Sequence, residues 1–266
     1  MMHKPFLPLA LTAALLGLGA CAADSAAPRP AVLAGDPDSA TFVPPEIEGY
    51  LKAGDLDAVA LLGPPPAPDS PRGLADAQRF EETRSLEGSD RWAKAAADDD
   101  LWGGKALKGY ACAAGLDISP QTTPVTAHIL ERAEQDVRTV STPAKDHYGR
   151  LRPLIGNDKP ICVPRALWME INASYPSGHS MTGWDWALIL VELAPEKAGA
   201  LLDAVKEMGE SRVVCGMHYP SDVEAGRDLA AAMVARMRAN PAFRADMEKA
   251  RREVARLKAP PSDCGA

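Results

Sequence analysis

Residues 174–184 have the sequence SYPSGHSMTGW, and this stretch carries much of what the sequence says about fold and function. Proline, serine and glycine make a poor helix interior but a good helix start. The residues that follow predict a helix that ends at Pro195. Its apolar stripe consists of Met181, Trp184, Leu188 and Val191. Such a turn either simply caps the helix or holds an anion between the Ser177 hydroxyl and the Gly178 amide, with His179 beside it as a proton donor.

Residues 125–140 also predict an amphipathic helix, because apolar side chains recur there at helical spacing. Next, Thr142 and Pro143 are typical of an N-cap and a first helical position, so a separate short helix is expected to begin there. That helix should end near Arg152, since Pro153 disfavours helical geometry in the residue before it.

A further helix is expected over residues 196–215, and one charged side chain takes an inward position on it. Its inward stripe consists of Leu201, Val205, Met208, Arg212 and Cys215. The segment 218–222 then leads into a last apolar-striped helix. That stripe consists of Leu229, Met233 and Met237. Beyond Pro241 the chain is rich in Arg, Lys and Glu, which indicates a helix face in solvent.

Several other segments are expected to carry no chemistry. The proline-dense run at 61–68 suits neither helix nor strand and predicts an extended segment lying on the domain. The acidic run at 98–100 is expected to be solvated surface rather than a metal site. His128 and His147 have no partners in sequence and are interpreted as surface or packing residues.

Length and composition indicate a helical domain without an overall basic surface. With 266 residues the chain can bury a full core and most simply folds as one domain. Apolar residues make up an ordinary 46%, and plentiful Ala, Leu, Met and Glu with only 5% aromatic residues favour helices over sheets. The net charge of −7 argues against a nucleic-acid partner, because no overall basic field attracts phosphate backbones. Any anion site must therefore be a local cluster of cations.

The first residues predict export from the cytoplasm. Residues 1–21 combine an apolar run with small residues at its end, as signal peptides do, and are too short for a spanning helix that stays in the membrane. The ending Leu-Gly-Ala-Cys21 resembles the lipobox of bacterial lipoproteins, in which the cysteine is lipidated. Ordinary cleavage after Ala20 or Ala22 is the alternative. No later segment has the roughly 18 apolar residues that a membrane span needs.

These features predict four regions and a location. The signal at 1–21 is followed by a flexible tether at 22–45, a folded domain at 46–258 and a C-terminal tail at 259–266. The expected location is the periplasm, with the membrane reached only through a lipid on Cys21.

Charged side chains in unusual places indicate a phosphate pocket. An unpaired Arg212 at an inward position would be costly, so it requires a partner, with a structural salt bridge as the alternative to an anion. Lys145 and Arg152 are seven residues apart and would point the same way from one helix face. His218 precedes Asp222 by four residues, so the carboxylate can fix one ring nitrogen and leave the other with a free lone pair.

In chain order these residues form the pattern Lys145-x6-Arg152-Pro153, Pro176-Ser177-Gly178-His179 and Ser211-Arg212-x5-His218-x3-Asp222. This pattern resembles the three-part signature of the type 2 phosphatidic acid phosphatase superfamily, which also contains the vanadium haloperoxidases. The flanking stretches AKDHYGRLRP, SYPSGHSMTGW and ESRVVCGMHYPSDVEAGR are similar to bacterial class A non-specific acid phosphatases. The proline run at 64–68 and the stretch 240–243 (NPAF) are similar too, so the resemblance runs from about residue 50 to the C-terminal helix.

The resemblance implies an all-α, single-domain helical bundle of the phosphatidic acid phosphatase type 2 / haloperoxidase kind. It implies an acid phosphatase that acts on small phosphate monoesters without a metal or other cofactor. It implies that His218 becomes a phosphohistidine, that Asp222 orients this ring and that His179 protonates the leaving alcohol. It also implies a set of phosphoryl-binding residues: Lys145, Arg152, Ser177, Gly178 and Arg212.

The cysteines fit an oxidising compartment. Removal of Cys21 leaves four, which allow three pairings, and none of the spacings is typical of a zinc site. Cys162 and Cys215 lie next to signature segments that must converge. They are therefore the expected pair, which leaves Cys112 for Cys264.

Two other functions remain as alternatives. A vanadate-dependent haloperoxidase would use the same cations, with His218 as the vanadate ligand, although such relatives have larger chains. An inactive phosphate-binding lipoprotein would use the pocket without turnover, although both histidines and Asp222 are intact. The sequence decides neither the preferred substrate, nor the balance between hydrolysis and phosphotransfer, nor whether the chain forms homo-oligomers.

Overall fold

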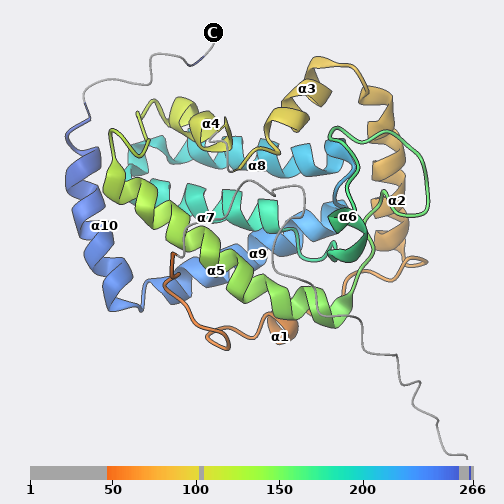
Figure 1. The fold of residues 1–266 in the computed structure, drawn as a ribbon, viewed down its shortest axis with the longest axis horizontal. Coiled ribbons are helices and arrows are strands. Elements are labelled where there is room, and N and C mark those ends of the chain that lie inside the picture. The colour runs from red at the N-terminus through yellow and green to blue at the C-terminus, as the bar shows by residue number, and fades with distance from the viewer. Residues whose placement is uncertain (1–46, 102–104, 258–263, 265–266) are drawn as a thin grey trace, which may run out of the picture. The chain divides into compact units, whose positions relative to one another are not determined.

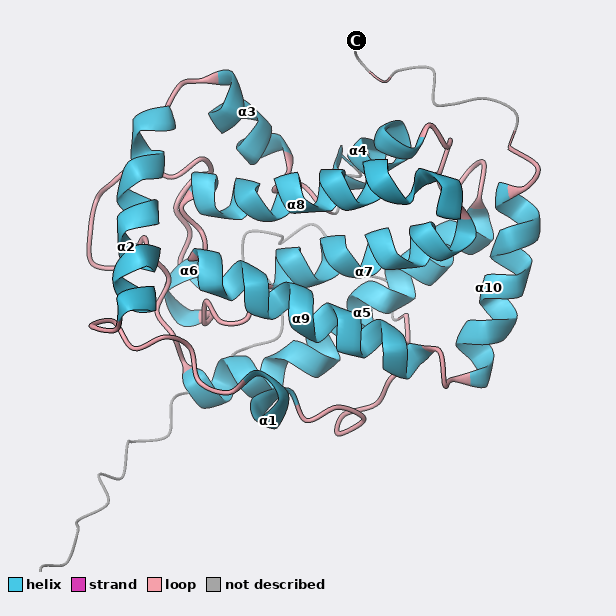
Figure 2. Cartoon of the chain, turned by 180° about the vertical axis from the view of Figure 1, so that it is seen from behind, coloured by secondary structure: helices cyan, strands magenta, loops and turns pink. Residues whose placement is uncertain are grey.

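The computed structural model describes residues 47–101, 105–257 and 264. Every regular element among these residues is a helix, so the all-α prediction is confirmed (Figure 2). The described residues all fall in one compact unit, which spans residues 34–266. The predicted signal, the tether and most of the C-terminal tail lie outside the described residues. Within the described part, no helix is both long and apolar enough to cross a membrane.

The chain forms ten α-helices and two short 3-10 turns over the described residues. In order they are α1 (Ala58–Leu62), α2 (Pro71–Thr83), η2 (Arg84–Leu86), α3 (Asp90–Ala97), α4 (Lys105–Ala114), α5 (Pro124–Tyr148), α6 (Trp168–Ile171), α7 (Gly178–Leu193), η3 (Pro195–Lys197), α8 (Ala198–Cys215), α9 (Pro220–Met237) and α10 (Pro241–Val254).

Helix α7 is the centre of the bundle and packs against α5, α8 and α9 (Figure 1). Its side chains are buried around most of its circumference, as expected for a helix with neighbours on several sides. Met181, Ile189 and Leu190 have no exposed surface. The helix that follows the PSGH turn is therefore the core of the fold.

The predicted start and end of this helix are confirmed. Ser177 is the N-cap, and its hydroxyl accepts a hydrogen bond from the Ser180 amide at 3.3 Å. The helix ends at Leu193, two residues before Pro195. The predicted inward stripe of α8 is also buried throughout, including Arg212, which is 1% exposed.

The prediction of a helix break at Thr142 and Pro143 is wrong, because α5 runs through Pro143 without interruption. A proline inside a helix removes one backbone hydrogen bond and costs about 3 kcal/mol. Val140 and Ala144 on the two sides of Pro143 are both buried, and this packing holds the helix together. Thr142 does not cap a helix; its hydroxyl donates to the Arg138 carbonyl at 2.8 Å.

The prediction that the chain beyond Pro241 only presents a solvated face is incomplete. Helix α10 packs against α5 and buries one of its faces (Figure 1). The buried residues of α10 are Phe243, Met247, Ala250 and Val254. The many charged residues hide this stripe in the sequence, because they occupy the remaining positions of the helix.

Both expected disulfides are present. Cys162 is bonded to Cys215 at the end of α8, and Cys112 of α4 is bonded to Cys264. The first disulfide lies three residues before His218, so it ties the loop that carries this histidine to residue 162.

Candidate active site

Lys145 and Arg152 reach one place by a different route from the one expected. Lys145 lies in the last turn of α5. This helix ends at Tyr148 and is capped by Gly149 in a left-handed conformation (φ 53°), so Arg152 lies beyond it. The two side chains nevertheless converge on one strip of backbone. The Lys145 ammonium donates to the Ala173 carbonyl at 2.7 Å, and the Arg152 Nε donates to the Asn172 carbonyl at 3.0 Å.

Burial and neighbouring positive charges lower the pKa values of both cations. Burial and the charge of Arg152 together lower the pKa of Lys145 to about 7. Burial and the charge of Arg212 together lower the pKa of Arg152 to about 10. Buried cations that lower one another's pKa are typical of a site that binds an anion.

Arg212 has buried donor groups that no atom of the described residues satisfies. Its NH2 group forms an ion pair with Asp99 at 2.6 Å. Its Nε and NH1 groups are buried and have no hydrogen-bond partner in the described structure. An unsatisfied buried donor costs about 1–3 kcal/mol, so two of them on one guanidinium require a ligand to account for them.

His218 lies in the turn between α8 and α9, with both ring nitrogens in contact with polar groups. Its Nε2 lies 3.1 Å from NH1 of Arg152. Because a guanidinium can only donate, Nε2 must be the acceptor and the proton must be on Nδ1. Nδ1 faces Asp222 Oδ2 at 3.6 Å and the Ser174 hydroxyl at 3.3 Å. The ring therefore presents a lone pair to the side where the cations gather.

The charge states of this pair suit a nucleophile. Burial would raise the pKa of Asp222, but the nearby His218 ring and the charge of Arg150 outweigh it and lower the pKa to about 2. Burial, assisted by the charge of Arg152, lowers the pKa of His218 well below its usual value, although Asp222 opposes the shift. His218 is thus neutral and Asp222 ionised under mildly acidic conditions.

The PSGH turn is attached directly to this pair. The Ser177 amide donates to the Asp222 main-chain carbonyl at 3.0 Å, which fixes the start of α7 against the start of α9. Gly178 is the first residue of α7, where a helix provides no internal partner for the amide. The positive end of the central helix therefore points to the same region as the arginines.

His179 follows in the first turn of α7 and contacts the segment after α3. Its Nε2 lies 3.0 Å from the Asp99 main-chain carbonyl and 3.7 Å from the Asp99 carboxylate. Burial and the charge of Arg212 lower the pKa of His179 to about 4, against the opposing charge of Asp99.

The expectation that residues 98–100 are plain solvated surface is wrong for the first two of them. Asp98 accepts a hydrogen bond from the Ser211 hydroxyl at 2.6 Å, while Asp99 contacts both Arg212 and His179. The cause is tertiary: α3 packs on α8 and brings the acidic run over the end of α8 that carries Arg212. Over the described residues, no cluster of three or more histidine, cysteine or acidic side chains is placed to hold a metal ion.

Sequence reasoning missed several polar residues around the site. Ser174 donates to Asp222 Oδ2 at 2.6 Å, and Arg150 donates to Asp222 Oδ1 at 2.6 Å. Both residues stand inside the stretches that carry the resemblance, and their place next to the named residues was the available signal. His128 and His147 contact neighbours on their own helix, as an exposed ion pair with Glu131 and a ring contact with Tyr148.

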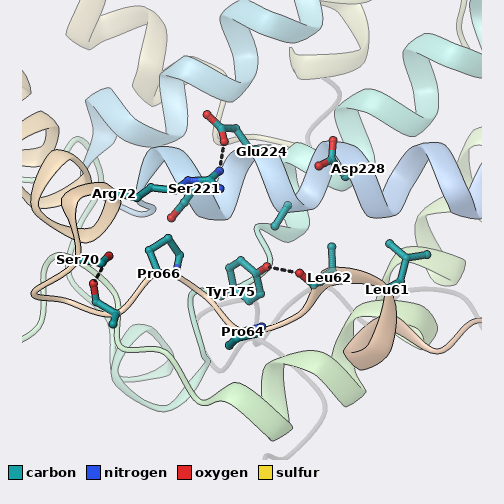
Figure 3. Close-up of a pocket in the computed structure, with 12 residues that line it drawn as sticks. Leu61, Leu62, Pro64, Pro66, Ser70, Arg72, Tyr175, Ser221, Glu224 and Asp228 are labelled. Atoms are coloured by element: carbon teal, nitrogen blue, oxygen red, sulfur yellow. Dashed lines mark hydrogen bonds and ion pairs between the residues drawn. The ribbon is translucent and has the colours of Figure 1, made fainter.

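A separate hollow of about 440 Å³ lies between residues 61–72 and α9 (Figure 3). Among the described residues that line it, the one cation is Arg72, which is paired with Glu224. Asp228 adds a further negative charge. This hollow therefore lacks the unpaired positive groups that a phosphate ester needs, in contrast to the surroundings of Arg212.

Comparison with known proteins identifies the family. Residues 137–244 match the PAP2 superfamily. The chain is 41% identical over 199 residues to an acid phosphatase of Zymomonas mobilis subsp. mobilis, covering 74% of this chain and 75% of the relative. It is 37% identical to a non-specific acid phosphatase of Providencia stuartii (79% and 86% covered) and 35% identical to one of Salmonella typhimurium (73% and 78% covered). The chain belongs to the PAP2 superfamily, and within it to the group that contains these bacterial acid phosphatases.

Proposed function

We propose that the protein is a periplasmic acid phosphatase that hydrolyses small phosphate monoesters through a phosphohistidine on His218. The observation that carries the proposal is the buried Arg212. Its Nε and NH1 donors have no hydrogen-bond partner among the described residues, and its charge acts on the neighbouring Arg152 and lowers the pKa of that guanidinium. The acid phosphatases to which the chain is similar supply the class of substrate. The signal-like N-terminus is the basis for the location.

In this proposal the phosphoryl group binds among three fixed cations and the start of α7. The Nε and NH1 groups of Arg212 take one or two non-bridging oxygens, and Arg152 and Lys145 take the others. The amide of Gly178 and the positive end of α7 complete the cradle, which is assembled before substrate arrives. Fixed donors of this kind stabilise the charge that spreads over the phosphoryl oxygens during transfer.

His218 attacks phosphorus through Nε2, and the alcohol leaves with a proton from His179. Nδ1 of His218 retains its proton, which Ser174 and Asp222 stabilise as the ring becomes positively charged. A water molecule then attacks the phosphohistidine and releases inorganic phosphate. His179 returns to its starting state by accepting a proton from that water.

The low pKa of His179 fits this role only in the presence of a bound anion. Without a ligand its pKa is about 4, because burial and Arg212 disfavour the charged ring. A bound phosphate ester carries negative charge beside the ring and raises this pKa, so the proton donor is restored when the substrate binds. The rate profile is expected to be bell-shaped and centred at acid pH.

The test is to trap the intermediate. Parent enzyme is mixed with a ³²P-labelled aryl phosphate, and the denatured protein is collected under conditions that preserve the acid-labile phosphohistidine. We expect label on the peptide that contains His218, no turnover in H218A, and a roughly 10²–10⁴-fold loss in H179A that is smallest for esters with good leaving groups. Unlabelled protein during active turnover, or an H218A variant as fast as the parent, would refute the mechanism.

A further inference from the structure

The carboxylate of Asp222 uses its two oxygens for two different tasks. Oδ2 faces the catalytic side, where it accepts hydrogen bonds from the Ser174 hydroxyl (2.6 Å) and the Tyr219 amide (2.9 Å) and lies 3.6 Å from Nδ1 of His218. Oδ1 faces the opposite way and accepts from NH1 of Arg150 at 2.6 Å. The direction in which Oδ2 points is therefore set partly by the guanidinium behind it.

Arg150 is itself held on several sides. Its NH2 donates to Asp76 Oδ2 at 2.8 Å, its NH1 also donates to the Ser221 hydroxyl at 2.7 Å, and its guanidinium stacks over the Tyr219 ring at 4.3 Å. Asp76 comes from α2, is 3% exposed, and accepts further hydrogen bonds from the amide (3.0 Å) and hydroxyl of Ser221. A continuous chain of polar contacts thus runs from α2 through Arg150 and Asp222 to His218.

The electrostatics of the site require a cation in this position. Two carboxylates, Asp76 and Asp222, are almost completely buried, and Arg150 lies between them. Buried carboxylates without a compensating charge become protonated. Burial would lower the pKa of Arg150, but Asp222 and Asp76 outweigh it and the pKa is raised, so the guanidinium stays charged between them.

The other charged groups that face the His218–Asp222 pair act from the phosphate side. They are Lys145 at the end of α5 and Arg152 in the loop after it, and both act on His218 to lower its pKa. Arg150 has its two terminal nitrogens engaged with carboxylates and Ser221, so it is committed to the back of the pair and not to the substrate.

We infer that Arg150, anchored by Asp76, is a positioning residue that keeps Asp222 ionised and aimed at Nδ1 of His218. The inference rests on the proposed function, because it assigns Arg150 a task only if His218 is the group that reacts. It makes α2 part of the catalytic apparatus, although α2 contributes no group to the phosphoryl pocket.

The decisive variant is Arg150→Gln, studied by the pH dependence of kcat/KM. Removing the cation lets the His218–Asp222 pair take up a proton at higher pH, since an opposite charge within 4–6 Å shifts a pKa by about 1–3 units. The proton is harmful on either residue, because it removes the lone pair of His218 or the acceptor that fixes Nδ1. The acid limb of the profile should therefore move up by about 1–3 pH units, and kcat at the optimum should fall about 10–100-fold, as for other outer-shell partners.

Two further variants separate charge from geometry. Arg150→Lys keeps the positive charge but cannot bridge Asp76 and Asp222 with a planar fork, so kcat should fall while the acid limb stays within about half a pH unit of the parent. Asp76→Asn leaves the cation in place but loosens it, and kcat should fall about tenfold with no upward shift of the acid limb. In all three variants the inhibition constant of inorganic phosphate should change less than threefold, because the phosphoryl cations are intact.

The matched control is Arg72→Gln. Arg72 lies on α2, as Asp76 does, and pairs with an acidic residue of α9, Glu224 (Figure 3). Both side chains of this pair are exposed. Exposed pairs contribute little, so the pH profile and kcat of R72Q should equal those of the parent.

The inference is overturned if R150Q keeps the parental acid limb, whether or not its activity falls, because a merely structural arginine would lower activity without moving that limb. Should R150Q fail to fold, D76N decides: kcat within twofold of the parent overturns the inference. If the parent itself forms no phosphohistidine, the proposed function fails. If the parent is labelled and R150Q is labelled at the parental rate at every pH, only the role of Arg150 fails.

Discussion

Arg212→Met is the substitution that best separates a catalytic arginine from a structural one. The side chain is 1% exposed, two of its three nitrogens have no partner, and the third is paired with Asp99, whose side chain is 32% exposed. Methionine has a similar length and adapts to the space, but it offers no donor.

The structure predicts a large loss of activity with little change in stability. Hydrogen bonds to charged groups contribute about 1.5–3 kcal/mol each, so losing two donors to the phosphoryl group should cost about 3–6 kcal/mol. At about 1.36 kcal/mol per factor of ten, kcat/KM should fall about 10²–10⁴-fold. Removing two unsatisfied buried donors relieves about 2–6 kcal/mol, which offsets the loss of the Asp99 pair. The free energy of unfolding in phosphate-free buffer should therefore stay within about 2 kcal/mol of the parent.

The assay is urea unfolding with and without inorganic phosphate, together with release of p-nitrophenol from its phosphate ester. At a phosphate concentration 100 times its Kd, the parent should gain about 2.7 kcal/mol; a variant that binds 100-fold more weakly should gain about 0.4 kcal/mol. Arg79→Met is the control. Arg79 of α2 forms a half-exposed ion pair with Glu210, which lies on α8 as Arg212 does. A loss of 3–5 kcal/mol in R212M without phosphate, with phosphate stabilisation retained, would mean that Arg212 is half of a structural salt bridge.

Four further outcomes follow from the buried titrating groups and from the disulfide. The basic limb of kcat should lie at higher pH than that of kcat/KM, because bound substrate raises the pKa of His179 from about 4. Inhibition by inorganic phosphate should weaken above pH 7, because Lys145 then loses its proton. Asp185→Asn should raise the free energy of unfolding at pH 7 and much less at pH 4, as measured by urea unfolding at several pH values. Burial raises the pKa of Asp185, so the parent loses stability as the carboxyl of the unfolded chain ionises above about pH 4. A neutral amide does not ionise, so the variant avoids this loss. Replacing Cys162 and Cys215 by serine should lower the free energy of unfolding, measured with urea, by about 4 kcal/mol. It should also lower kcat, because the disulfide restrains the loop before His218. An unchanged kcat would show that other contacts hold this loop.

Local patterns predicted the elements that depend on nearby residues. The start of α7 at the PSGH turn, the buried stripe of α8 and the buried stripe of α9 all follow from capping residues and helical spacing. The convergence of the three signature segments was expected from the resemblance. In the structure Arg152 contacts His218 and acts electrostatically on His179, and Arg212 acts electrostatically on both His179 and Arg152. Their chemical roles remain proposals that the experiments above test.

The errors have one cause, which is contact between segments far apart in the chain. Pro143 was expected to break a helix, but burial of α5 on both sides of it outweighs the local penalty. Asp99 was expected to be solvated, but packing of α3 on α8 carries it to Arg212, 113 residues later. Charged residues along α10 concealed a stripe that packs on α5.

The sequence by itself determined that the chain is helical, where its central helix begins, and which cations and histidines are candidates for a phosphoryl site, because these properties depend on residue type and short-range spacing. Only the tertiary structure decided what stands behind the site. Asp76 and Arg150 are 74 residues apart, and Asp222 follows Arg150 by 72 more, yet they form one chain of contacts to His218. No local pattern encodes such a chain, because the free energy that holds it comes from burying charged groups together, and burial is set by the packing of α2, α5, α7 and α9 as a whole.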